Sequence, residues 1–297
     1  MKKILVTGAA GFIGEALVKR LSVNNKIKIY AIDKKKMSFK KNNIKFFKKD
    51  LRFVKKFPRV DIVIHLAAFN GTKHFYNKPL EVIEHNFIPT MNLINFYKQN
   101  PCALFVYSGT SEIYAGNKFK NTKNVNLKEN DKIIFDDIQN PRWSYASSKF
   151  MSEVAVINSK LKYIILRYFN VYGPNQIDHF IPEFISRLKI NRYELYGYKN
   201  KRSFIFIDDA INATIKLINN QKSKNQIFNV GSEKEISILN CAKQILKIIK
   251  IKKKIKLYDS PLGSPKRRKP NISKTKKLIG EFNKISLKEG LKKILNY

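Results

Sequence analysis

Residues 7–14 read TGAAGFIG and directly follow the apolar run Ile-Leu-Val at residues 4–6. Glycines at positions 8, 11 and 14 permit a tight turn from a strand into a helix. A helix that begins at such a turn offers unpaired N–H groups to a pyrophosphate, which can approach the backbone closely. The stretch therefore predicts a dinucleotide site at the start of an α/β fold. The residues predicted to hold the cofactor there are Gly8, Gly11, Phe12, Ile13 and Gly14.

Asp33 stands 19 residues after Gly14, at the end of the next predicted strand. An acidic residue at this distance accepts hydrogen bonds from the adenosine ribose of a dinucleotide. Its negative charge repels a 2′-phosphate, although Lys34, Lys35 and Lys36 follow at once and weaken that argument. The sequence favours NAD over NADP.

Short apolar runs alternate with helical stretches through the first half of the chain. The predicted strands lie at residues 2–8, 27–33, 44–50, 61–68 and 102–109, and predicted helices begin near Phe12 and at Pro79. Strands separated by helices of this length form parallel β-α-β units with helices on both faces of the sheet. The fold class predicted is therefore α/β, with a Rossmann-type doubly wound parallel sheet.

The second half is less regular and begins after the turn YGPN at residues 172–175. We expect residues 1–173 to form the NAD-binding Rossmann domain, with residues 203–230 returning to it. Residues 174–297 are expected to form a smaller C-terminal α/β domain that binds a nucleotide sugar.

The chain has a formal net charge of +37, which raises the question of an anionic partner. Most of the basic residues are lysines scattered along 297 residues, and no zinc finger or RNA-recognition signature accompanies them. Attraction of small anionic substrates is favoured over nucleic-acid binding. The two cysteines and four histidines are not spaced as a metal site or disulfide framework. No apolar run reaches the roughly 18 residues that cross a membrane, so a cytoplasmic protein is expected.

Two further stretches carry reactive side chains. The segment SGTSEIYAG at residues 108–116 follows an apolar run and contains Thr110 and Glu112. The segment YASSK places Tyr145 and Lys149 four residues apart, so both share one face of a helix. The ammonium is expected to lower the tyrosine pKa, which would make Tyr145 a base near neutral pH.

Taken together, these motifs resemble the extended short-chain dehydrogenase/reductase superfamily, in its branch of nucleotide-sugar epimerases and dehydratases. The resemblance runs through nearly the whole chain and rests on an ordered set of motifs: TGAAGFIG, Asp33, DL at 50–51, HLAA at 65–68, Asn86, TSEIY at 110–114, YASSK at 145–149, RYFNVYGP at 167–174, RSFIFIDDA at 202–210, NVG at 229–231 and KRRKPNISKTKKLIG at 266–280.

The resemblance implies roles for individual residues. Asp50 and Leu51 would hold the adenine, while Ala67, Ala68 and Lys149 would contact the nicotinamide ribose, with Leu66, Asn86 and Tyr145 also in the cofactor site. Ser111, Asn170, Arg202 and Arg268 would bind the sugar and diphosphate of the substrate. Arginine suits the latter task, because its planar fork matches phosphate oxygens.

The implied reaction begins with oxidation of a nucleotide-bound hexose at C4, with hydride passing to NAD. Tyr145 takes the hydroxyl proton and Thr110 relays it, and the 4-keto sugar is then epimerised or, with Glu112 as the base at C5, dehydrated. A Glu at this position is typical of dehydratases and decarboxylases, whereas a 4-epimerase needs none. The alternatives are a decarboxylase of the UDP-glucuronate type and an NADP-dependent 4-keto-sugar reductase.

A non-catalytic NAD-binding protein or a basic RNA-binding protein is the alternative of another class, and the intact set of Thr110, Tyr145 and Lys149 argues against it. The resemblance also implies a homodimer formed by the helices near residues 79–98 and 145–160. Two departures from the family pattern leave the substrate open: Asn271 replaces the usual Asp after Pro270, and a long Asn- and Lys-rich connection spans residues 116–140.

Overall fold

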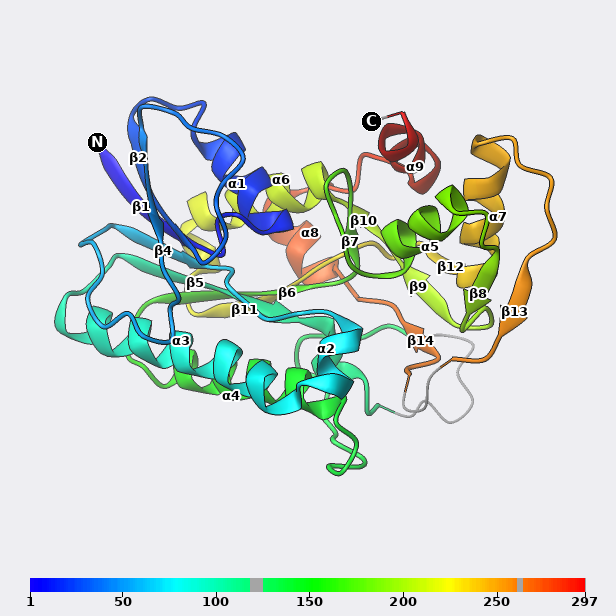
Figure 1. Cartoon of the computed structure of the whole chain (residues 1–297). Helices are drawn as coiled ribbons and strands as arrows, with labels where there is room; N and C mark the ends of the chain where they lie inside the picture. Colours follow the sequence, from blue (N-terminus) through cyan, green and yellow to red (C-terminus); the bar gives the residue numbers. More distant parts are fainter. Residues whose placement is uncertain (118–124, 261–263, 297) are drawn as a thin grey trace.

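The structure is a computed structural model that describes residues 1–117, 125–260 and 264–296. Within them, seven parallel strands form one twisted sheet (Figure 1). Their order across the sheet is β3 (Ile44–Lys48), β2 (Ile27–Asp33), β1 (Lys2–Thr7), β4 (Ile62–His65), β5 (Leu104–Thr110), β6 (Tyr163–Tyr168) and β11 (Gln226–Val230). The predicted fold class is therefore confirmed. The order reverses between β1 and β4, which is where a doubly wound sheet forms its ligand crevice.

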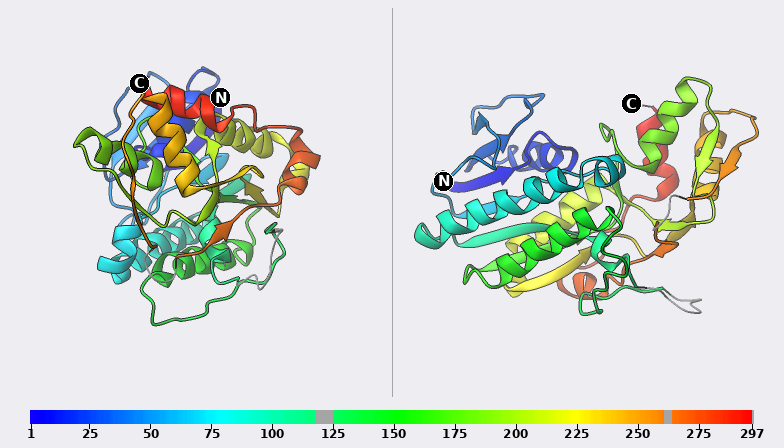
Figure 2. Two further views of the ribbon diagram at one scale, coloured as in Figure 1. Left: turned by 90° about the vertical axis from the view of Figure 1, so that its right-hand side faces the viewer. Right: turned by 60° about the horizontal axis from the view of Figure 1, so that its bottom comes forward.

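Helices cover both faces of the sheet (Figures 1 and 2). One face carries α1 (Phe12–Leu21) and α6 (Ile207–Asn219), and α8 (Ser273–Ile279) packs against α6 and β11. The opposite face carries α3 (Pro79–Gln99) and α4 (Trp143–Ile157), which lie side by side. The short helix α2 (Thr72–Asn77) precedes α3. The short helix η1 (Ser111–Tyr114) follows β5.

Alternate side chains of the central strands fill two separate cores. On β1, Ile4 and Val6 point to the face of α1 and α6, while Leu5 points to the face of α3 and α4. The strands are apolar on both faces because both faces are covered, as parallel sheets require. This burial brings the carboxyl ends of β1, β4 and β5 to one edge of the sheet.

The C-terminal elements lie beyond that edge (Figure 1). They comprise small sheets and three helices: β7 (Val171–Tyr172) with β10 (Ile205–Phe206), β8 (Glu194–Tyr196) with β13 (Lys256–Tyr258), β9 (Lys201–Ser203) with β12 (Glu235–Ser237) and β14 (Arg267–Arg268), α5 (Phe180–Lys189), α7 (Ile238–Ile248) and α9 (Leu287–Leu295), besides the turn η2 (Gln221–Ser223). One hydrophobic cluster continues from the sheet into these elements. The division into two domains at residue 173 therefore stays a prediction.

His65 ends β4 and serves the fold. Its ring is fully buried, with Nδ1 2.6 Å from Thr7 Oγ1 and Nε2 3.0 Å from Thr90 Oγ1. Burial, assisted by the charge of Lys149, lowers the pKa of His65 to about 3, so the ring stays neutral and ties β1, β4 and α3 together. In the described part of the chain, no helix combines the length and the apolar character that a membrane crossing needs.

Candidate active site

A cleft of about 680 Å³ opens at the carboxyl ends of the central strands and continues between the sheet and the C-terminal elements. Its walls come from the turn after β1, the ends of β2, β4 and β5, the start of α4 and the segments around α5, β9 and β14. Ligands of doubly wound folds bind at this place, because loops from strands on both sides of the switch point face each other there.

The glycine turn after β1 is shaped by two close approaches. Gly8 has a φ of +70°, and a Cβ on it would lie 2.6 Å from the backbone nitrogen of Ala67. A Cβ on Gly14 would lie 1.9 Å from the carbonyl oxygen of Gly8. Gly11 precedes α1 and caps it with no side-chain hydrogen bond, so the first-turn N–H groups are available to an anion. The turn therefore fits the diphosphate of a dinucleotide.

Asp33 lies beside this turn at the end of β2. Its Oδ2 accepts a hydrogen bond from the backbone N–H of Ala10 at 3.0 Å, and its Oδ1 accepts one from the N–H of Lys35 at 2.8 Å. The carboxylate also lines the cleft, as does Asp50, whose pKa the hydrogen-bonded Arg52 lowers. These two acids form one end of the cleft, where the sequence predicts the adenosine.

The structure brings most of the predicted residues to the walls of this one cleft. Those lining it are Gly8, Gly11, Phe12, Ile13, Gly14, Asp33, Asp50, Leu51, Leu66, Ala67, Ala68, Thr110, Ser111, Glu112, Tyr145, Asn170, Arg202 and Arg268. Among the predicted residues, all of them described, Asn86 and Lys149 do not line it.

Asn86 and Lys149 lie behind the wall. The side chain of Asn86 accepts a hydrogen bond from the N–H of Phe69 at 2.7 Å and donates one to Ser148 at 3.2 Å, so it holds the loop after β4 against α4. Lys149 is 1% exposed, and its Nζ lies 3.5 Å from the hydroxyl oxygen of Ser108, which does line the cleft. Asn86 thus supports the wall of the cleft, and its contact with a cofactor stays a prediction.

Tyr145 and Thr110 meet at the centre of the cleft. Tyr145 lies in the first turn of α4, and Thr110 ends β5 and forms a side-chain hydrogen bond with the Tyr145 hydroxyl. Both side chains are largely buried, at 6% and 7% exposure. A hydroxyl pair at the end of a strand and the start of a helix is a fixed route for one proton.

The predicted effect of Lys149 on Tyr145 is wrong for the protein described here. Burial raises the pKa of Tyr145 well above its ordinary value, and the hydrogen bond from Thr110 only partly opposes that rise. The Lys149 ammonium instead faces Ser108 and lies 4.2 Å above the ring centroid of Tyr107. Its own pKa is lowered by burial to about 7. The i, i+4 spacing places Tyr145 and Lys149 on the same helix, but it does not determine how deeply each side chain is buried.

Glu112 is held between two arginines. Arg142 Nη2 donates to its Oε2 at 2.7 Å, and Arg268 Nη1 forms an ion pair with its Oε1. Burial alone would raise the pKa of the Glu112 carboxyl, but the two guanidinium groups outweigh it and hold that pKa well below its ordinary value. Glu112 is therefore a weak base in this arrangement, and the role at C5 that the sequence left open for it stays a prediction.

A third arginine completes this group, which we call the arginine cluster: Arg142, Arg202 and Arg268 around Glu112. Burial and the charges of Arg268 and Arg142 lower the pKa of Arg202 to about 9. Nearby, Asn170 adopts a positive φ of 36° and donates its amide to the carbonyl of Ser203 at 2.9 Å. The cluster carries three guanidinium groups and one carboxylate, so its charge suits an anionic ligand.

Comparison with known proteins places this geometry in a family. Residues 4–231 match the profile of the NAD dependent epimerase/dehydratase family. The chain belongs to this family. The expected family, the expected use of NAD and the expectation of an enzyme are confirmed, since the match covers the dinucleotide turn and the whole Tyr145 region.

Individual relatives of this epimerase/dehydratase family member span most of its length. A UDP-N-acetyl-alpha-D-glucosaminuronate decarboxylase of Bacillus cytotoxicus is 30% identical over 100% of this chain and 97% of that protein. A dTDP-D-glucose 4,6-dehydratase of Dictyostelium discoideum is 32% identical over 84% of this chain, but the match spans only 62% of that protein. The crystal structure of a UDP-glucuronic acid 4-epimerase from Bacillus cereus, with UDP-glucuronic acid and NAD, superposes with a TM-score of 0.87 at 27% identity, covering 99% of this chain and 98% of that one.

The sequence interpretation missed three residues of the site of this family member. Arg142 stands three residues before Tyr145, so its place one turn ahead on the same helix end was the available signal. Phe75 on α2 stacks on the Tyr145 ring, and no pattern in the sequence pointed to it. Tyr196 lines the far end of the cleft and stacks on Tyr258 with ring centroids 5.0 Å apart.

Proposed function

We propose that this protein uses NAD to oxidise C4 of a nucleotide-linked hexuronic acid and that the sugar then loses its C6 carboxylate as carbon dioxide. The observation that carries the proposal is the arginine cluster, which surrounds Glu112 beside the Tyr145–Thr110 pair. The family, the dinucleotide turn and Asp33 support NAD as the hydride acceptor.

The charge of the cluster supports an acidic sugar. Arg202 and Arg268 match the positions that the family uses for the substrate diphosphate. Arg142 is the third arginine of the cluster and has no such assignment. It is 7% exposed and lies at the start of the helix that carries Tyr145. Its guanidinium lines the cleft beside Glu112, and a guanidinium favours a carboxylate, whose two oxygens fit its fork. In a hexuronic acid the carboxylate stands at C6, two bonds from C4.

The first step uses the chain's own hydroxyl groups. Tyr145 gives up its own hydroxyl proton through Thr110 to solvent in the cleft and takes the proton of the C4 hydroxyl in its place. Lys149 supports the wall from behind through Ser108. NAD, when bound, supplies the hydride acceptor for the hydrogen on C4. The sugar that results has a ketone at C4 and a carboxylate at C6, which is a β-keto acid.

The second step needs no base at C5. The C5–C6 bond breaks, carbon dioxide leaves, and the electron pair of that bond forms the enolate of the C4 ketone, which then takes a proton at C5. Dehydration would instead require a base to remove the C5 proton. Glu112, paired with Arg142 and Arg268, is poorly suited to that task because its pKa is held low. Its fitting role is to orient the two arginines.

The relatives add support from outside the chain. The relative in Bacillus cytotoxicus that matches along its whole length is named a decarboxylase of an acidic nucleotide sugar. Several further relatives, among them one of Arabidopsis thaliana at 27% identity, are named UDP-glucuronic acid decarboxylases. For this chain, such names favour the acidic substrate that the arginine cluster favours independently.

Epimerisation at C4 of the same acid is the second candidate. The structural match to the UDP-glucuronic acid 4-epimerase of Bacillus cereus favours it. In that case the sugar turns over in the cleft, hydride returns to the other face of C4 and the carboxylate is kept. Both candidates share the first step and the substrate class.

Product analysis decides between them. The full chain is incubated with NAD and, separately, with UDP-glucuronic acid, UDP-N-acetylglucosaminuronic acid, UDP-glucose and UDP-N-acetylglucosamine, and the products are weighed by mass spectrometry. Loss of a ¹³C label from C6 of an acid supports the proposal, and a product of unchanged mass but altered configuration supports epimerisation. Turnover of the neutral sugars alone would refute an acidic substrate. Tyr145→Phe is the control and should lose nearly all turnover.

A further inference from the structure

Glu153 and Arg167 form a buried ion pair on the side of β5 that faces α4. Glu153 is 1% exposed and Arg167 is 3% exposed. Arg167 donates to the Glu153 carboxylate from Nε at 3.1 and 3.3 Å and from Nη2 at 2.8 Å. The planar guanidinium thus binds the planar carboxylate through two of its nitrogens. Burying an ion pair costs desolvation free energy, and removing one partner of a buried pair destabilises the fold. The burial of this pair therefore requires an explanation.

The pair lies directly behind the wall of the cleft. A Cβ on Gly109 would lie 2.5 Å from Glu153 Oε1 and 3.0 Å from Cγ of Arg167. Gly109 lines the cleft between Ser108 and Thr110. The carboxylate therefore occupies the space that a side chain at position 109 would take, and it supports the strand end that presents Thr110 to Tyr145.

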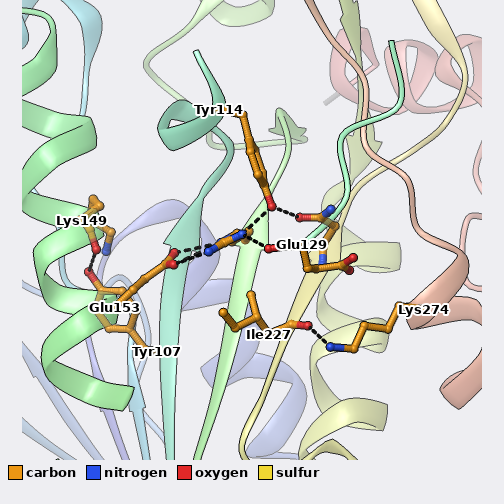
Figure 3. A network of polar contacts seen from close by, with 9 residues as sticks. Tyr107, Tyr114, Glu129, Lys149, Glu153, Ile227 and Lys274 are labelled. Carbon is orange, nitrogen blue, oxygen red and sulfur yellow. Dashed lines mark hydrogen bonds and ion pairs between the residues drawn. The ribbon is translucent and has the colours of Figure 1, made fainter. Parts of the chain in front are cut away.

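A chain of hydrogen bonds runs from the pair to Tyr114, which follows Glu112 by two residues (Figure 3). Arg167 Nη1 donates to the Tyr114 hydroxyl at 2.6 Å, and this hydroxyl donates to Asn229 Oδ1 at 3.1 Å. The Asn229 amide donates to the carbonyl groups of Leu127 and Asn271. Tyr114 ends the short helix that carries Glu112, and Asn271 follows Arg268 by three residues. One buried network thus joins the segments that form the site.

The same pair stands one helical turn from Lys149. Lys149 and Glu153 are four residues apart on the buried face of α4, and their charges interact. The other titratable groups near the ammonium are Tyr107 on β5, below it at 4.2 Å, and the neutral His65 on β4. Among these described neighbours, Glu153 supplies the negative charge.

The remaining elements around Lys149 contribute no opposing carboxylate among the described groups that interact with it. On α4 the un-ionised Tyr145 lies one turn earlier, and α3 contributes the neutral Asn86 through Ser148. Arg167 on β6 touches Glu153; burial lowers the pKa of its guanidinium, but the Glu153 carboxylate and the Tyr114 hydroxyl outweigh that effect and raise it. The charge of Lys149 thus depends on one neighbour.

We propose that Glu153 is a positioning residue of the reaction: seated behind Gly109 by Arg167 and one helical turn from Lys149, it keeps the Lys149 ammonium charged beneath the cleft. The inference rests on the proposed function for its kinetic consequence. Burial lowers the pKa of Lys149 to about 7, and Glu153 opposes that fall. Removing the carboxylate therefore lowers the Lys149 pKa further, so that less of the ammonium remains at neutral pH.

The first test measures Lys149 itself and needs no activity. The full chain is labelled with ¹³Cε-lysine, and the resonance that disappears in Lys149→Met is followed by NMR as the pH is varied. Glu153→Gln keeps the shape and should move the midpoint down by about one pH unit. Glu153→Asp keeps the charge and should move it by only a few tenths of a unit. Tyr114→Phe breaks the network beyond Arg167 and is the matched control, with an unchanged midpoint.

The second test is kinetic. With the acid that the unaltered enzyme turns over, Glu153→Gln should lower kcat by about fivefold at one pH unit above the shifted midpoint, and the loss should approach about tenfold at higher pH and vanish at low pH. Glu153→Asp should restore most of the loss. If no sugar is turned over, the proposed function fails while the NMR result stands. An unmoved Lys149 midpoint in Glu153→Gln overturns the inference, whatever the activity.

A double variant controls for a folding defect of Glu153→Gln. Glu153→Gln leaves the Arg167 charge buried without its carboxylate, which destabilises the fold. The double variant Glu153→Gln/Arg167→Gln removes both charges and restores a neutral pair. Because the Lys149 charge is coupled to Glu153 and not to Arg167, the double variant should show the same downward shift of the Lys149 midpoint. A return to the unaltered midpoint would assign the pair a purely structural role.

Discussion

Phe75 lies flat against Tyr145, with ring centroids 4.6 Å apart and planes inclined by 15°. Phe75 belongs to α2, a six-residue helix between β4 and α3, and is 2% exposed. The contact fixes the plane of the tyrosine ring, while Thr110 fixes its hydroxyl. Two elements that are remote in sequence thus define one position for the reacting oxygen.

Replacing Phe75 by Leu is expected to lower kcat by about tenfold with little change in NAD affinity, because the ring of Tyr145 gains freedom about its axis. Steady-state kinetics and NAD titration by fluorescence measure the two effects. Phe96→Leu is the matched control, since Phe96 packs on Phe57 and Tyr97 in the other core. An equal loss of kcat in both variants would count against a positioning role for Phe75.

Arg142→Met is expected to raise KM for an acidic nucleotide sugar by about ten- to a hundredfold, because a charge-assisted contact with the C6 carboxylate is lost. Its effect on a neutral nucleotide sugar should be small. The measurement is the ratio of KM values for UDP-glucuronic acid and UDP-glucose, with the latter taken as a competitive inhibitor if it is not turned over. Equal losses for both ligands would contradict recognition of a carboxylate by Arg142.

The stability contributed by Glu112 should depend on pH in one direction. Its pKa is lowered in the folded protein from an ordinary value of 4.5, so its contribution is present above that value and disappears as the pH falls below it. Urea unfolding should show Glu112→Gln to be less stable by about 3 kcal/mol near pH 7, with a difference that shrinks toward about pH 3. A difference that is constant with pH would show that the carboxylate is not ionised against the arginines.

Helices α3 and α4 expose a row of apolar side chains on their outer face: Leu80, Ile83, Ile88, Met151, Val154 and Ile157. Leu80 is 67% exposed and Met151 is 49% exposed. The homodimer expected through these two helices stays a prediction, and this face is where it would form. Met151→Glu should shift sedimentation velocity toward the monomer, whereas Val23→Glu, at an exposed apolar site on another face, should not. A monomer already in the unaltered protein would exclude the dimer.

The local features of the fold were predictable because each arises from neighbours in sequence. The glycine turn, the helix that begins at Phe12 and the acid at position 33 follow from strand, turn and helix rules over about thirty residues. The parallel, doubly wound sheet followed from the alternation of strands and helices, which leaves few topologies. The family resemblance then predicted that Thr110, Tyr145 and Arg268 belong to one site, and all three line the same cleft.

The electrostatic state of the site could not be predicted in this way. The spacing of Tyr145 and Lys149 was interpreted as a charge effect on the tyrosine, but burial by Phe75 and the strand end dominates that pKa. Glu112 was expected to be a free base, and its two arginine partners lie 30 and 156 residues away in sequence. Interactions at such separations depend on the folded chain.

Two expectations remain outside what the structure tests. The long connection at residues 116–140 lies partly outside the described residues, which resume at Val125. Where it is described, Leu127 pairs with Pro270, and its N–H donates to the carbonyl of Lys269, next to Arg268. Asn271 donates its backbone N–H to Leu127 and its side chain accepts from Ser273. The side chain at position 271 therefore contacts the first residue of α8.

The three-to-one ratio of arginines to carboxylates in the cluster has a consequence for turnover. A bound hexuronic acid brings one carboxylate besides its diphosphate, and that carboxylate leaves the cleft as a neutral gas. Arg142, 7% exposed, then faces a product that has lost its carboxylate. Under the proposed reaction, the loss of carbon dioxide weakens the hold on the sugar at the moment when the sugar must depart, so the chemical step itself promotes release of the product.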